Sequence, residues 1–120
     1  MSFRKRNGGV DLSETEITSD MLRGHTDTMI LRILSEADCY GYEIVKLIAR
    51  RSEGEYELKE ATMYSSVRRL EVDGDIQSYW GDESQGGRRK YFKITEKGRS
   101  TYADKKRNWA YAKRVLDNLI

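Results

Sequence analysis

Apolar residues recur at intervals of three and four in four stretches of the chain, which is the spacing of one face of an α-helix. In the third stretch Met63, Val67 and Leu70 form the apolar stripe, and Gly74 follows as a helix-terminating residue. The second apolar stretch ends around Gly54, and Thr95 precedes the last stretch. The pattern predicts helices over residues 19–36, from about 41 to 51, 60–73 and 96–120.

Alternation of apolar and polar residues replaces the helical spacing on both sides of one charged stretch. Ile76, Ser78 and Trp80 occupy alternate positions, and so do Phe92 and Ile94, so we expect two strands joined as a hairpin. Three short helices, a hairpin and a long last helix, in that order, predict a mainly α fold with a small β-hairpin: a winged helix-turn-helix with a long C-terminal dimerisation helix. The expected parts are an N-terminal arm or short helix (1–18), the winged helix-turn-helix (19–95) and the dimerisation helix (96–120).

The third predicted helix has an outward face suited to DNA. Opposite its apolar stripe lie Ala61, Ser65 and Arg68, small near the start of the helix and basic further along, so the helix can approach base edges. In the hairpin, two glycines allow a tight tip and three bases follow them. The alternative for this tip is a solvated loop whose bases pair with nearby acids. The candidate DNA-binding residues are Lys59, Ala61, Thr62, Tyr64, Ser65, Arg68, Gly87, Arg88, Arg89 and Lys90.

The last predicted helix carries an apolar seam. Tyr102, Trp109 and Leu116 are seven residues apart, while Ala112 and Leu119 fall three residues after the second and third of them. A helix of this length cannot bury such a seam against a small domain, so we expect these five residues to form a homodimer interface. Lys105 interrupts the seam and indicates that its first heptad is open.

Composition narrows the possible functions. The 120-residue chain has a net charge of +2, 38% hydrophobic and 35% charged residues, which is polar for a self-sufficient domain and favours a partner chain. With one cysteine, Cys39, and one histidine, His25, we expect no disulfide, metal, cofactor or catalytic group. No apolar run approaches the roughly 18 residues that span a bilayer, so we expect a cytoplasmic protein rather than a membrane protein. Because the chain has no recognisable nucleophile or metal-ligand spacing, we do not expect an enzyme.

Three motifs resemble the PadR family of bacterial transcriptional regulators: YGYEI at 40–44, ATMYSSVRRLEVDG at 61–74 and GGRRKYFKITEKG at 86–98. The resemblance covers about residues 21 to 120 and is greatest to the short, multidrug-responsive members. It implies that Tyr64 contacts DNA, that Tyr40 and Tyr42 pack the second helix against the core and the wing, and that Trp109 stacks on planar aromatic ligands at the dimer interface.

The effector pocket implied by the resemblance surrounds Trp109. The candidate ligand-binding residues are Tyr102, Lys105, Trp109, Ala112, Lys113 and Leu116. Lys113 stands where a pocket for cationic drugs would need an acid, so we expect neutral or anionic aromatics. The alternative is that Trp109 is ordinary coiled-coil core.

These expectations combine into one function and one rival. The first is a homodimeric repressor that binds a two-fold symmetric operator on double-stranded DNA and controls an efflux transporter or its own gene. The rival is a protein that binds or sequesters small molecules and uses the winged helix for protein contacts. It predicts that alanine at Arg68 and Arg88 leaves function intact.

Overall fold

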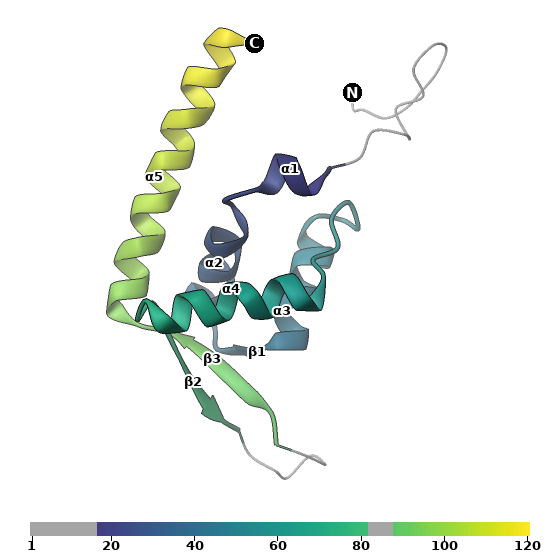
Figure 1. Ribbon diagram of the computed structural model, residues 1–120, viewed down its shortest axis with the longest axis vertical. Helices are drawn as coiled ribbons and strands as arrows, with labels where there is room; N and C mark the ends of the chain where they lie inside the picture. Colours follow the sequence, from purple (N-terminus) through teal and green to yellow (C-terminus); the bar gives the residue numbers. More distant parts are fainter. Residues whose placement is uncertain (1–16, 82–87) are drawn as a thin grey trace.

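A computed structural model describes residues 17–81 and 88–120 (Figure 1). The predictions for residues 1–16 and for Gly87 therefore lie outside the described residues. Mainly helical with a small antiparallel sheet and a long C-terminal helix, the chain has the predicted winged helix-turn-helix fold. Its elements are α1 (Ser19–Leu22), α2 (Thr26–Glu36), β1 (Cys39–Tyr40), α3 (Gly41–Arg51), α4 (Glu60–Val72), β2 (Ile76–Trp80), β3 (Lys90–Ile94) and α5 (Glu96–Leu119).

Helix ends follow the local chemistry of the sequence. The hydroxyl of Thr95 accepts a hydrogen bond from the backbone N–H of Gly98 at 2.9 Å and caps α5. After α4, Gly74 adopts a φ of +83°, the left-handed conformation that ends a helix. Lys59, at the start of α4, makes no side-chain capping bond, as its residue type predicts. α3 has a carboxylate at its start, where Glu43 accepts from the backbone N–H of Tyr40 at 3.1 Å.

The single helix predicted over 19–36 is wrong, because the chain forms two helices there. Gly24 takes a φ of +87°, which interrupts helical geometry, and the backbone N–H of His25 bonds to the carbonyl of Leu22 at 2.9 Å before α2 begins. α1 is therefore a separate four-residue helix without buried residues.

The sheet has three strands rather than the predicted two, in the order β1-β3-β2, all antiparallel. The additional strand, β1, contains two residues and pairs Cys39 with Phe92 and Tyr40 with Tyr91. Across the hairpin, Ile76 pairs with Ile94. β1 therefore attaches the middle of β3 to the helical body beside α3.

One apolar core joins α2, α3, α4 and the sheet. The predicted stripe of α4 is buried: Met63, Val67 and Leu70 are each at most 3% exposed. Tyr40 is half-buried, with its ring edge-on to Tyr91 at 5.5 Å, which agrees with packing against the wing. The same prediction is wrong for Tyr42, which is 56% exposed, because its position on α3 points away from the core.

A buried carboxylate connects α5 to the turn after α4. Asp75 is 4% exposed and accepts a hydrogen bond from the hydroxyl of Thr101 at 2.8 Å. Its carboxylate also forms an ion pair with Nζ of Lys97 at 3.0 Å. The hydroxyl of Thr95 also contacts the carbonyls of Gly74 and Asp75 at 2.7 and 3.0 Å. The orientation of α5 relative to α4 is therefore fixed by polar contacts as well as by packing. In Figure 1, α5 projects from the body on the side opposite the hairpin.

Candidate nucleic-acid interface

The outward face of α4 is exposed along its whole length. Because the helix buries Met63, Ser66, Val67 and Leu70 on its inner side, the opposite positions face solvent. The predicted DNA-binding residues on this element and at its N-cap are all exposed: Lys59, Ala61, Thr62, Tyr64, Ser65 and Arg68. The structure thus places six of the predicted residues on one accessible helix surface.

Two adjacent arginines on α4 have different environments. Arg69 is held by Asp27 of α2, with Nη2 2.8 Å from the carboxylate, and this hydrogen bond raises the pKa of Arg69. Asp27 also accepts from the buried hydroxyl of Ser66, which fixes α4 against α2. Within the described part of the chain, Arg68 has no ion-pair partner, so its guanidinium is available to a ligand outside the protein.

Tyr64 lies where α4 meets the start of α3. The side chain is 45% exposed, and a Cβ at Gly41 would lie 2.8 Å from its hydroxyl oxygen. Gly41 therefore gives the Tyr64 ring room to lie across the first turn of α3. The side chain stays partly exposed beside the outward face of α4.

The bases after the hairpin tip lie close to aromatic rings. The guanidinium carbon of Arg88 is 5.0 Å from the centre of the Trp80 ring, and that of Arg89 is 4.7 Å from the centre of the Tyr40 ring. Both arginines and Lys90 are exposed. Cation–π contacts of this kind orient a guanidinium relative to the ring.

Tyr79 links the hairpin to the body through its hydroxyl and packs on Tyr91 through its ring. Its hydroxyl donates to Asp38 at 2.6 Å, and its ring stacks on Tyr91 at 5.6 Å. The hydrogen bond to Asp38 raises the pKa of Tyr79 to about 12, because it stabilises the protonated phenol. This hydrogen bond joins the hairpin to the segment between α2 and β1.

A second feature is a groove of about 720 Å³ between α5 and the α1–α2 segment. Three predicted ligand-binding residues line it, namely Tyr102, Trp109 and Leu116, whereas Lys105, Ala112 and Lys113 do not. Lys113 pairs with Asp117 at 3.4 Å. Sequence reasoning missed the opposite wall, formed by Ile17, Met21, Leu22, His25, Thr28, Met29 and Arg32, and also Lys106 on α5.

His25 contacts Trp109, the tryptophan predicted to bind the ligand. Its ring meets the Trp109 ring edge-on, with centroids 5.0 Å apart and an angle of 75° between the planes. Trp109 remains 46% exposed. The described walls carry three bases, His25, Arg32 and Lys106, and no carboxylate, so the groove offers hydrogen-bond donors and positive charge around an aromatic surface.

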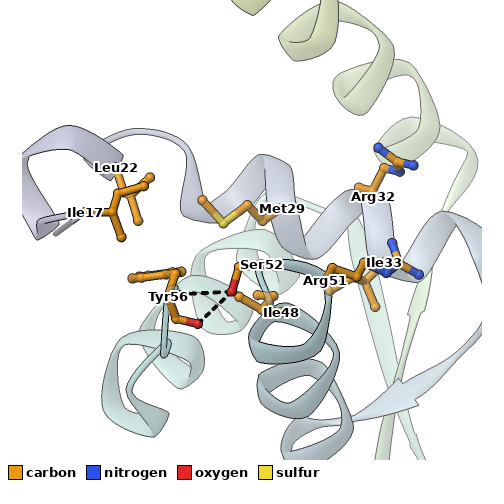
Figure 2. Close-up of a pocket in the computed structure, with 9 residues that line it drawn as sticks. All are labelled: Ile17, Leu22, Met29, Arg32, Ile33, Ile48, Arg51, Ser52 and Tyr56. Atoms are coloured by element: carbon orange, nitrogen blue, oxygen red, sulfur yellow. Dashed lines mark hydrogen bonds between the residues drawn. The ribbon is translucent and has the colours of Figure 1, made fainter. Parts of the chain in front are cut away.

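An adjoining pocket of about 450 Å³ lies between α1, α2 and the end of α3 (Figure 2). It shares Ile17, Leu22, Met29 and Arg32 with the groove. On its far side the hydroxyl of Ser52 bonds to both the backbone N–H and the carbonyl of Tyr56, at 3.0 and 3.2 Å. The α1–α2 segment therefore contributes walls to both cavities.

The described residues offer little for other chemistry. They contain no group of three or more histidine, cysteine or acidic residues placed to hold a metal ion. Burial raises the pKa of the Cys39 thiol to about 11, so the thiol is protonated and a poor nucleophile at neutral pH. Among the described helices, none combines the length and the apolar character needed to cross a membrane.

Two solved structures with a similar fold bear the name of transcriptional regulators. A transcriptional regulator from Clostridium thermocellum is 43% identical, with a TM-score of 0.80 over 87% of this chain and 98% of that chain. A PadR family transcription regulator from Clostridium difficile R20291 is 42% identical, with a TM-score of 0.70 over 80% and 98% of the two chains. A protein of Lysinibacillus sphaericus, named only as uncharacterized protein X, is 43% identical over 84% of this chain and 93% of its own length.

The family model described as "Transcriptional regulator PadR-like family" matches residues 30–104, from the middle of α2 into α5. The matched segment contains the exposed face of α4 and the basic hairpin, the two elements that a winged helix-turn-helix presents to DNA. The match thus covers more than half of the chain and agrees with the fold of the similar structures. This chain belongs to the PadR-like family of transcriptional regulators, and it is a DNA-binding regulator rather than an enzyme.

Proposed function

We propose that this regulator is a homodimeric repressor released from its operator by a planar aromatic effector. The observation that carries the proposal is the outward face of α4. Its small residues permit close approach to base edges, and Arg68 is available at its basic end. In the proposed complex, α4 enters a major groove while the wing holds the neighbouring backbone.

Exposed apolar residues along α5 support dimerisation. Trp109 and Leu116 are each 46% exposed, and Leu119 is 72% exposed, on a helix of 24 residues. Apolar residues repeated every seven positions on an exposed helix are typical of a helix that pairs with another. Two copies related by a two-fold axis would read half-sites about one helical turn of DNA apart.

The groove beside Trp109 supports the effector site. Its volume lies within the range of small-molecule pockets, and the indole face suits a flat ring. Because its described walls carry three bases, His25, Arg32 and Lys106, and no carboxylate, we propose that it selects neutral or anionic aromatics over cationic ones. An effector changes DNA affinity when it binds one relative arrangement of the two winged helix-turn-helix domains more tightly than another. Release would derepress an efflux transporter or the regulator's own gene.

The first experiment is fluorescence anisotropy of a labelled duplex from upstream of the regulator's own gene, compared with a shuffled duplex at two salt concentrations. We expect tight, salt-sensitive preference for the native sequence. Arg68→Ala should reduce this preference, whereas Arg114→Ala should leave it unchanged, because Arg114 stacks on Tyr111 near the far end of α5. Equal affinity of the wild-type protein for both duplexes, unaltered by Arg68→Ala, would contradict sequence-specific binding and favour the sequestering alternative.

The dimer and the effector require separate measurements. Sedimentation equilibrium should give twice the 14.0 kDa chain mass. Trp109→Phe should abolish quenching by an anionic planar dye, while Trp80→Phe should retain it as a matched control. Tighter binding of a cationic dye than of its anionic analogue would contradict the proposed charge selectivity.

A further inference from the structure

The two faces of the hairpin differ in what they contact: one packs against the helices near its base, and the other bonds to the segment before β1. Side chains alternate between the faces of a strand, so the paired residues Ile76 and Ile94 lie on one face and the paired residues Tyr79 and Tyr91 on the other. Ile76 and Ile94 are buried against the helices. The first face is called the α4 side here, because the hydroxyl of Ser78 on this face donates to Glu71 of α4 at 2.5 Å.

Further along the hairpin, the α4 side leaves the core and becomes exposed. Its next residue on β2 is Trp80, which pairs with Lys90 on β3. Trp80 is 56% exposed, although a large aromatic ring on a core-facing strand position is normally covered. Arg88 lies two residues before Lys90 and reaches the same ring, with its guanidinium carbon 5.0 Å from the ring centre.

The opposite side of the hairpin is occupied by contacts within the protein. Tyr79 bonds to Asp38 and stacks on Tyr91, and Tyr91 in turn meets the ring of Tyr40. Arg89 lies over the Tyr40 ring. This side therefore holds the hairpin to the body, while the α4 side presents an indole and two basic side chains outward.

We propose that Trp80 and Arg88 make a composite contact with one DNA strand: the indole packs on a deoxyribose, and the guanidinium held over the indole donates to an adjacent phosphate. The sugar offers an apolar face and the phosphate two acceptor oxygens, so the ring and the guanidinium match neighbouring parts of the backbone. Lys90, across the strand pair from Trp80, adds a second positive charge. A contact with sugar and phosphate contributes affinity but no base preference.

The proposal rests on DNA binding by this regulator, but its test does not need the operator. A shuffled duplex at low salt is sufficient, because backbone contacts are made with any sequence. We expect Trp80→Ala to weaken binding to native and shuffled duplexes by the same factor, about tenfold, and Trp80→Phe to weaken it much less. Tyr111→Ala is the matched control, since it removes an exposed aromatic ring from α5, away from the hairpin, and should leave affinity unchanged.

Charge and packing contributions can be separated with Arg88. Arg88→Ala should lower the slope of log affinity against log salt by about one, whereas Trp80→Ala should leave the slope unchanged. Lys93→Ala, an exposed base that pairs with Gln77 on the opposite side, is the charge-matched control. Because the ring positions the guanidinium, the double variant should lose less affinity than the product of the two single losses.

A direct measurement on the unaltered sequence avoids any effect of the variants on folding. Wild-type protein labelled with 5-fluorotryptophan has two fluorine resonances, and the Trp80→Phe spectrum identifies that of Trp80. Saturating duplex should shift the Trp80 resonance and protect it from a soluble paramagnetic quencher. An unchanged Trp80 resonance while anisotropy shows bound DNA would overturn the composite contact and leave DNA binding itself intact. No binding of wild-type protein to either duplex at low salt would overturn both.

Discussion

Replacing Gly98 with alanine tests how closely α5 approaches the body. A Cβ at this position would lie far inside 3.0 Å of the Asp75 carbonyl oxygen and 2.8 Å from Cγ1 of buried Ile94. The carbonyl oxygen is backbone and already accepts from the N–H and the hydroxyl of Thr95, each at 3.0 Å. The methyl group therefore forces the first turn of α5 away from the α4–β2 turn.

The change in the free energy of unfolding caused by Gly98→Ala is the sum of opposing contributions. Alanine is favoured over glycine inside a helix by about 1 kcal/mol. Overpacking that moves backbone costs about 3 kcal/mol, and weakening two hydrogen bonds costs about 1 kcal/mol each. With partial relaxation, we expect Gly98→Ala to lower the free energy of unfolding by about 2–4 kcal/mol, against the direction of helix propensity.

Urea unfolding followed by circular dichroism at 222 nm measures this difference. Several protein concentrations are needed, because the stability of the proposed dimer would depend on concentration. Ser100→Ala, at an exposed position two residues later on α5, is the control and should be neutral or slightly stabilising. If Gly98→Ala were as stable as the wild type, the close contact between α5 and Asp75 would be incorrect.

Three further predictions concern other contacts. The Cys39 thiol should resist Ellman's reagent at pH 8 until the protein is unfolded, because burial raises its pKa to about 11. The contribution of the protonated thiol to the free energy of unfolding is complete below the ordinary pKa near 9 and is lost as the pH rises through 11. Asp27→Asn should lower the free energy of unfolding by about 1–2 kcal/mol in urea titrations, because it weakens the bonds to buried Ser66 and to Arg69. Thr95→Ala should cost about 1 kcal/mol in the same assay through loss of the α5 cap, and Thr95→Ser should restore most of it.

Local signals in the sequence account for most of the secondary structure. The periodic stripe of α4, Gly74 after it and Thr95 before α5 each act within one or two turns of chain, so the sequence was sufficient to place those helix ends. Gly24 was available as a signal for the break between α1 and α2, but the apolar spacing continues across it. The two-residue strand β1 has too few positions for an alternating pattern and depends on pairing with β3 about fifty residues later.

Contacts between distant segments explain what sequence patterns missed at the site. His25 meets Trp109 only because the α1–α2 segment packs beside α5, and periodicity within either segment contains no information about the other. Among the lysines of α5, the pattern selected Lys105, whereas Lys106 lines the groove, since one residue turns a side chain by about 100° around a helix. The exposed face of α4 was predictable because it is the complement of a buried stripe on the same element.

The absence of a linker between the wing and α5 has a mechanical consequence. β3 ends at Ile94 and α5 begins at Glu96, with Thr95 bonded to the body between them. The helix of 24 residues is about 36 Å long, so tilting it by about 5° about its far end displaces the wing by about 3 Å. That displacement is close to the rise of about 3.4 Å per base pair. In the proposed dimer, a small change in the crossing angle of the two α5 helices would therefore move each wing by about one base-pair step along the DNA.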